Sequence, residues 1–251
     1  MATTQFKNDC KIFFSNNSLA NGDFVVTLPN TIILGPEEAR YKVSLSTLSF
    51  DFCPINVIDT ECQINYEKEG IEDVYGPDTD NYSTIESLVS TLNSIGKTEN
   101  SGISFGIDKK HERVKINVPA RMEVRMSEKL SNMTGFTVGE VYDETTLAAR
   151  QPDIYAAYRP MYLCSKTLAK PSLTCTAGFL PIIQPIDLNG LLFEENRRVT
   201  FYAEPKHWVD LASSQFHHVD FYFLESDMKT VAKFLPTHCE IELDFKRDKL
   251  F

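Results

Sequence analysis

Five histidines are the side chains in this sequence best suited to hold a metal ion or to move a proton near neutral pH. His217 and His218 are adjacent, and neighbouring side chains of a regular strand point to opposite faces, so the two cannot both bind one metal ion. His111 falls in an expected hairpin turn, His207 in a loop and His238 at the start of a strand. Three distant loops would have to meet to complete a site, so the spacing predicts no metal centre.

A group of carboxylates near the C-terminus is the second candidate set. Glu240, Glu242 and Asp244 could serve as acid–base groups or calcium ligands. They alternate with apolar residues from Cys239 to Phe245, which is typical of a strand with one face in the core and the other in water. The chain also lacks a Gly-x-x-x-x-Gly-Lys phosphate loop and a Gly-x-Gly-x-x-Gly turn. We therefore expect an exposed strand face, no catalytic residues, no cofactor and no enzyme activity.

Lys206, His207 and Trp208 form a candidate partner interface. Trp208 is the only tryptophan of the chain and follows Pro205 in an expected loop. A large amphipathic ring in a loop can anchor a partner, but it can also plug the end of a sandwich, and both interpretations remain open. A second basic stretch, at 109–113, is typical of a solvated hairpin tip, because so few charges bind phosphate only weakly.

The cysteines give no sign of a disulfide framework. The spacing contains neither a Cys-x-x-Cys pair nor a zinc-like arrangement, and each cysteine stands among apolar or strand-forming neighbours. We expect buried free thiols, in agreement with a reducing compartment. The six positions are 10, 53, 62, 164, 175 and 239.

The charge balance and the absence of long apolar runs limit the partners. The formal net charge of −10 argues against a surface built to grip a phosphate backbone, so no specific nucleic acid partner is expected. The N-terminus has no apolar run behind a basic start, and the longest apolar stretch, 179–188, is interrupted by Pro181 and Pro185. We expect a protein made in soluble form inside the cell, without a membrane partner.

The elements that would position these residues are mainly strands. The 17 Phe and 10 Tyr favour half-buried strands, and many short runs are separated by turn residues. This pattern predicts a single jelly-roll β-sandwich, while an immunoglobulin-like sandwich would need a Cys, Trp, Cys constellation that the chain lacks. The expected strands cover 10–14, 24–28, 41–52, 62–66, 161–165, 173–176, 179–186, 198–203, 219–224 and 239–245.

A small α+β unit interrupts the strands. Ser83 and Glu86 form a capping box at the start of an amphipathic helix that we expect to end at Gly96. Alternating residues predict a hairpin over 103–118, and a short helix is expected over 127–135. The polar stretches 67–80 and 137–151 read as flanking loops. The sequence therefore predicts a sandwich formed by 1–66 and 152–251, and an inserted unit at 67–151 that is too small for a core of its own and leans on the sandwich.

Three groups of motifs follow one another along nearly the whole chain. The N-terminal group is Asp-Phe-Val-Val-Thr-Leu-Pro at 23–29 and Tyr-Lys-Val-Ser-Leu-Ser at 41–46. The middle group is Asn-Tyr-Ser-Thr-Ile-Glu-Ser-Leu at 81–88, Leu-Asn at 92–93, the strand pair 103–107 and 114–118, and 126–136. The C-terminal group is Met-Tyr-Leu-Cys at 161–164, Phe-Leu-Pro-Ile-Ile at 179–183, the strand 216–224 and Glu-Ile-Glu-Leu-Asp-Phe at 240–245. In this order the chain resembles the penton, or minor capsid, proteins of polinton/Maverick elements and adintovirus-like viruses.

The resemblance implies a structural protein of the virion capsid. It implies a jelly-roll that forms homopentamers at the vertices of an icosahedral shell, beside a major capsid protein of double jelly-roll type, and it brings no catalytic residues. The final acidic strand and the loop around Trp208 depart from the family pattern, so no interface residue is carried over from it. A jelly-roll module that binds a receptor or a glycan is the alternative function.

Overall fold

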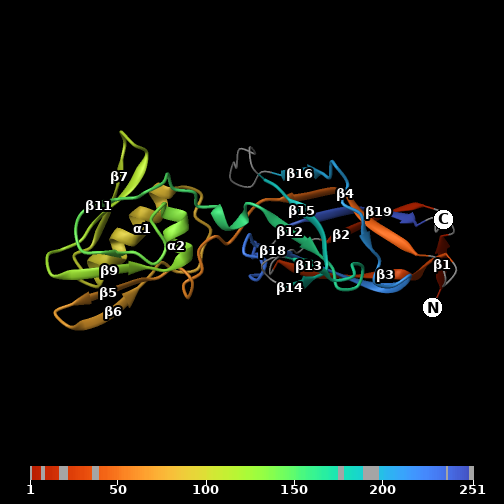
Figure 1. The fold of residues 1–251 in the computed structure, drawn as a ribbon, viewed down its shortest axis with the longest axis horizontal. Coiled ribbons are helices and arrows are strands. Elements are labelled where there is room, and N and C mark those ends of the chain that lie inside the picture. The colour runs from red at the N-terminus through yellow and green to blue at the C-terminus, as the bar shows by residue number, and fades with distance from the viewer. Residues whose placement is uncertain are drawn as a thin grey trace. The chain divides into compact units, whose positions relative to one another are not determined.

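The structure is a computed structural model that describes residues 2–6, 9–16, 22–35, 40–174, 178–188, 198–235 and 237–248. Its fold is mainly β, as expected, and it divides into two compact units (Figure 1). We call residues 1–54 and 158–251 the jelly-roll unit and residues 55–157 the inserted unit. A short 3-10 helix, η1 (Ala156–Tyr158), spans the second boundary in the sequence.

The jelly-roll unit contains two five-stranded sheets and a small hairpin. The first sheet has the spatial order β16 (Arg198–Tyr202), β4 (Tyr41–Asp51), β19 (Cys239–Arg247) and β2 (Cys10–Asn16), and β17 (Val209–Asp210) also pairs with β4. The second sheet has the order β1 (Thr3–Phe6), β3 (Asp23–Leu34), β18 (Gln215–Leu224), β12 (Met161–Cys164) and β15 (Ile182–Ile186). The hairpin joins β13 (Ser172–Thr174) to β14 (Gly178–Leu180).

The strand order identifies a jelly-roll. If β2, β3, β4, β12, β15, β16, β18 and β19 are lettered B to I in chain order, the two sheets read B-I-D-G and C-H-E-F. Strands from the two ends of the chain therefore lie side by side, and Figure 1 shows this as blue strands beside red and orange ones. This is the arrangement of an eight-stranded double Greek key, so the predicted fold class is confirmed.

Aromatic side chains fill the core of the jelly-roll unit. Phe50 of β4 is fully buried and its ring contacts those of Phe52, Phe223 and Phe234 at centroid distances between 5.8 and 6.1 Å. These are the offset and edge-to-face arrangements that aromatic pairs prefer. Further along, Phe14 of β2 meets Phe221 of β18 at 5.1 Å, edge to face. The high aromatic content of the sequence thus fills the space between the two sheets.

The inserted unit has two sheets and two helices. The four-stranded sheet has the order β10 (Val141–Tyr142), β9 (Met122–Met126), β5 (Ile64–Lys68) and β6 (Ile71–Tyr75). The three-stranded sheet has the order β11 (Thr146–Leu147), β8 (Arg113–Asn117) and β7 (Ser104–Asp108). The helices are α1 (Ile85–Thr98) and α2 (Glu128–Thr134).

The helix ends differ from the expected ones at α1. Its N-cap is Thr84, whose hydroxyl accepts a hydrogen bond from the Ser87 N–H at 3.2 Å, so the expected Ser83–Glu86 box does not form. The helix also continues through Gly96 to Thr98. Gly96 instead allows a close approach, because a Cβ there would lie only 3.2 Å from both the Ile103 carbonyl oxygen and the Tyr75 hydroxyl.

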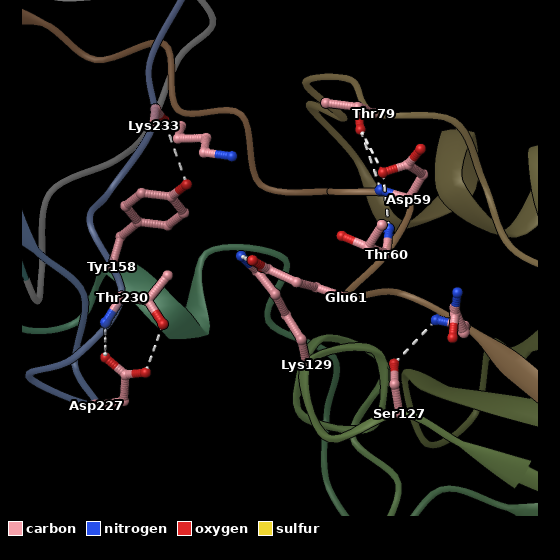
Figure 2. Close-up of polar contacts among 11 residues, drawn as sticks. Asp59, Thr60, Glu61, Thr79, Ser127, Lys129, Tyr158, Asp227, Thr230 and Lys233 are labelled. Atoms are coloured by element: carbon pink, nitrogen blue, oxygen red, sulfur yellow. Dashed lines mark hydrogen bonds and ion pairs between the residues drawn. The ribbon is translucent and has the colours of Figure 1, made fainter. Parts of the chain in front are cut away.

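The expected end of α2 is confirmed, whereas Ser127 at its start makes no capping hydrogen bond with its side chain. Gly135 closes the helix with a φ of 83°, in the left-handed region. Ser127 occupies the N-cap position, but its hydroxyl accepts a hydrogen bond from the backbone N–H of Gln63 at 3.0 Å (Figure 2). In the same unit Lys129 of α2 forms an ion pair with Glu61 at 2.8 Å. Both contacts tie α2 to the segment that leads into β5.

The boundaries of the inserted unit lie outside the expected range of 67–151. The segment 55–66 belongs to this unit because β5 pairs with β6 and β9 and with no described strand of the jelly-roll unit. The stretch 67–80, expected as a loop, contains β6, and β9 was not foreseen. With these strands the unit encloses its own core, so the expectation that it lacks one is wrong. Fully buried members of this core include Ile64, Leu88, Leu92, Val114, Ile116, Val124 and Leu130.

The thiols agree with the sequence analysis where they are described. Cys164 and Cys239 are buried and free, Cys10 is free and half-buried, and Cys53 and Cys62 are buried. Cys175 and the end of the expected strand at 173–176 lie outside the described residues. The rest of that strand is β13.

A fragment of residues 55–157 should fold by itself, because the core of the inserted unit is built from residues within that range. We expect a single cooperative unfolding transition in urea and dispersed amide signals in its NMR spectrum. Leu92→Ala in the fragment should cost about 3 kcal/mol, since the side chain is fully buried. A fragment without a cooperative transition would contradict the independence of this core.

Candidate functional site

The carboxylates of β19 lie on the outer face of the first sheet, but they are not simply exposed to water. Glu240 forms an ion pair with Arg198 of β16, and Glu242 with Lys11 of β2 at 2.8 Å. Asp244 is buried and pairs with Lys206. Each carboxylate thus has a cation from a flanking segment, which corrects the expected water-facing row.

The electrostatics of this row argue for structural ion pairs. A hydrogen bond with His238, with Arg198 nearby, lowers the pKa of Glu240 below its usual value. A hydrogen bond from Lys11 in the same way lowers the pKa of Glu242, and the pKa of Lys11 is raised by that bond. Both carboxylates therefore stay ionised near neutral pH, as expected of members of ion pairs rather than of acid–base groups.

The predicted partner interface is docked on the jelly-roll unit. Lys206 is engaged with Asp244, and the His207 ring Nδ1 lies 3.0 Å from the carbonyl oxygen of Ile183 in β15. Trp208 is half-buried, and the Lys246 ammonium lies 5.6 Å from its ring centroid. The three residues therefore stay together on one short segment between β16 and β17, and a partner that binds them stays a prediction.

His217 and His218 lie on an irregular part of β18, contrary to the regular strand expected from the sequence. The pairing of β18 with β3 shifts register between Phe216 and His218, so the strand is not regular there. The rings of His217 and His218 meet edge to face with centroids 4.7 Å apart, although alternation would have separated them. His218 Nδ1 is hydrogen-bonded to the Thr27 hydroxyl at 3.1 Å. Among the described residues, no group of three or more His, Cys, Asp or Glu side chains could hold a metal ion.

One pentapeptide, Gly102 to Gly106, fits the Gly-x-Ser-x-Gly pattern of a nucleophile elbow, which the sequence analysis missed. Such an elbow places the serine on a sharp turn between a strand and a helix. Ser104 instead begins β7, and its hydroxyl accepts a hydrogen bond from the Asn117 side chain at 3.2 Å in the neighbouring β8. The match is therefore part of a hairpin.

Burial makes three of the described thiols poor nucleophiles. It raises the pKa of Cys164 and that of Cys239 to about 12 each. Burial, together with Asp9 and Asp244, raises the pKa of Cys10 to about 11. The thiolate, which is the reactive form, is thus scarce at neutral pH.

Asp220 of β18 organises a turn that the sequence analysis did not single out. Its carboxylate accepts hydrogen bonds from the Thr167 hydroxyl at 2.5 Å, the Thr167 N–H at 2.7 Å and the Lys166 N–H at 3.0 Å. The Ser165 hydroxyl donates a further bond at 3.3 Å. Burial raises the pKa of Asp220, but these hydrogen bonds outweigh it, and the pKa lies below its usual value.

Two exposed aromatic rings lie on the outer face of the first sheet, at opposite edges. Phe13 of β2 is 59% exposed and Tyr202 of β16 is 67% exposed. The register places them in one row across the four strands, in the order Phe13, Glu242, Thr47 and Tyr202. At the usual strand spacing the two edge positions are about 14 Å apart. In the sequence, the alternation of Phe13 with the inward-facing residues of β2 was the pattern that could have predicted its outward position.

The open face of the four-stranded sheet in the inserted unit is acidic. Glu67 stands directly opposite Glu72 on one side and Glu123 on the other, and these residues line a shallow hollow of about 520 Å³. Opposed like charges destabilise a sheet. The inserted unit as a whole has 18 acidic and 10 basic residues, whereas the jelly-roll unit has 17 and 15. Most of the net negative charge therefore belongs to the inserted unit.

No protein-family model and no curated protein matches the chain. Among solved structures, it is similar to the mavirus penton protein, with 12% sequence identity and a TM-score of 0.49 over 96% of this chain and 100% of that chain. A chain of the Sputnik virophage structure is similar at 12% identity and a TM-score of 0.49, over 96% of this chain and 98% of that chain. The fold assignment of the jelly-roll unit rests on its own strand order.

The helices of the described chain are too short or too polar to cross a membrane. Both helices instead pack their apolar residues into the core of the inserted unit.

Asp220→Asn should destabilise the protein by about 1 to 2 kcal/mol at pH 7, because the amide accepts the four hydrogen bonds less well than the carboxylate. The folded pKa of Asp220 is lowered, so its contribution is complete above the ordinary carboxyl pKa of about 4 and is lost as the pH falls through the folded value. Urea unfolding from pH 7 down to about pH 3 should show the difference shrinking. The exposed Asp210→Asn is the control, and a pH-independent difference would contradict this role of the charge.

Lys206→Met should cost about 1 to 2 kcal/mol, because it leaves the buried Asp244 carboxylate with Lys11 at 3.7 Å as its remaining ion-pair partner among the described residues. Asp244→Asn in the same background should restore part of the loss. A double-mutant cycle by urea unfolding should give a coupling energy of about 1 kcal/mol. Additive single and double effects would show that the pair contributes nothing to stability.

Proposed function

We propose that this chain is a structural capsid protein, a penton (minor capsid) subunit that assembles as a homopentamer at the vertices of an icosahedral shell. The observation that carries the proposal is the complete B-I-D-G and C-H-E-F strand order in a chain whose motif order resembles polinton penton proteins. The neighbouring capsomer would be a major capsid protein of double jelly-roll type. The site of action is the virion capsid.

The chemistry of the described side chains supports a structural protein rather than an enzyme. The carboxylates of β19 are held in ion pairs, burial raises the pKa of the Cys164 and Cys239 thiols, and the serine of the elbow-like pentapeptide lies in a hairpin. The jelly-roll unit is also close to neutral. Its formal net charge is −2, whereas that of the inserted unit is −8. Copies of the jelly-roll unit can therefore approach with little electrostatic repulsion.

The inserted unit provides a second, self-contained surface. In the sequence it is inserted between β4 and β12. It has its own core and exposes an acidic sheet face. We propose that the jelly-roll unit builds the shell and that the inserted unit serves contacts other than those between jelly-rolls.

Negative-stain images of the purified full chain should show rings with fivefold symmetry, and sedimentation velocity should show one species larger than the monomer. Since heterologous contacts close into a ring when the rotation per subunit permits, the species should not grow further with concentration. A monomer across a range of protein and salt concentrations would overturn the proposal. Clear hits on a glycan array, combined with the absence of rings, would favour a jelly-roll binding module instead.

A further inference from the structure

The proposed ring requires two different surfaces on each copy. In a heterologous contact one patch of a subunit meets another patch of its neighbour, so the two patches must lie on separate sides of the same rigid body. In the first sheet of the jelly-roll unit, β2 and β16 are the two ends of the strand order. Among the described strands, β2 pairs with β19 and β16 pairs with β4. The outer edge of each strand thus has no partner among the described strands.

Each edge carries one large exposed aromatic side chain. Phe13 on β2 and Tyr202 on β16 are 59% and 67% exposed, and both point away from the core. Aromatic side chains with this exposure are costly to leave in water and are the residues that most often dominate interface energies. They occupy one cross-strand row, so one rigid sheet fixes their separation.

The surface between the two rings needs no charged partner. Glu242 lies in the row itself and pairs with Lys11 at 2.8 Å, and it also accepts a hydrogen bond from the Thr47 hydroxyl at 3.2 Å. Glu240 beside the row pairs with Arg198. Because these carboxylates are already neutralised within the subunit, a neighbour can cover the edges without desolvating an unpaired charge.

We propose that the edge of β2 around Phe13 on one copy packs against the edge of β16 around Tyr202 on a second copy of this chain, and that repetition of this contact closes the ring. The inference rests on the proposed function and names the surface that the proposed homopentamer uses. A second copy is the occupant because the two aromatic edges lie on opposite ends of one sheet and the unit that carries them is close to neutral.

The test uses the full chain with Phe13→Ser and Tyr202→Ser as single variants. Both side chains are exposed, so thermal unfolding of either variant should stay close to that of the wild type. Each substitution should weaken the contact between copies about tenfold or more. Phe179→Ser is the matched control, since Phe179 is an equally exposed aromatic residue, at 72%, on the separate β13–β14 hairpin, and this variant should still form rings.

Mixing the two variants tests the direction of the contact. In each variant alone every contact has one defective side, so sedimentation should show monomers at a concentration where the wild type forms rings. In a mixture, the intact Tyr202 edge of the Phe13→Ser copy can meet the intact Phe13 edge of the Tyr202→Ser copy. The mixture should therefore give 1:1 dimers that cannot grow into rings.

Four outcomes would overturn the inference. A wild-type ring together with rings of either variant would remove these edges from the interface and leave the proposed function standing. Dimers of one variant alone would indicate contact between like edges. Loss of glycan-array binding in the variants with unchanged rings would assign the aromatic face to a sugar ligand. A wild-type protein that stays monomeric would overturn the inference and the proposed function together.

Discussion

The position of β19 between β2 and β4 is the constraint on which the rest of the jelly-roll unit depends. The last strand of the chain supplies the inward side chains Ile241, Leu243 and Phe245, all fully or almost fully buried, and connects two strands from the N-terminal fifth of the sequence. Its outward side chains carry the ion pairs with Lys11, Arg198 and Lys206. One strand therefore completes the sheet, the core and the outer charged row, and it does so through contacts that are distant in sequence.

This long-range pairing explains how the chain accommodates a whole folded unit between β4 and β12. The cost of closing a flexible loop rises only by about 0.6 kcal/mol for each doubling of its length, so an insertion at a connection between strands is tolerated. The inserted unit also has its own core, which means that its folding does not have to be supported by the sandwich. The two units differ in charge as well, since the net charge of the chain is concentrated in the inserted unit. A near-neutral unit suited to packing and an acidic unit with an open sheet face are thus combined in one chain.

Much of this arrangement could be predicted from local patterns, and the exceptions have physical causes. The strict alternation in β19 and the helical spacing in α1 predicted both elements, because one face of each is buried and the other is not. β6 was missed because four of its five residues are exposed and only Tyr75 is buried, so no alternation of apolar and polar residues marks it as a strand. The start of α1 was misplaced by one residue because Ser83 and Thr84 can both cap a helix, and only the backbone geometry selects Thr84.

The candidate surfaces were less predictable than the fold. The β19 carboxylates were expected to face water, since the sequence does not reveal that cations from β2, β16 and the loop before β17 meet them. The contact between His217 and His218 depends on a register shift, which period-two alternation cannot reveal. The row that joins Phe13 to Tyr202 exists only once four strands from both ends of the chain are in register.

The proposed homopentamer is tested most directly by the native mass spectrum of the full chain, whose monomer mass is 28.5 kDa. We expect a dominant species with five times that mass, and a spectrum that contains only the monomer at all concentrations would contradict the homopentamer.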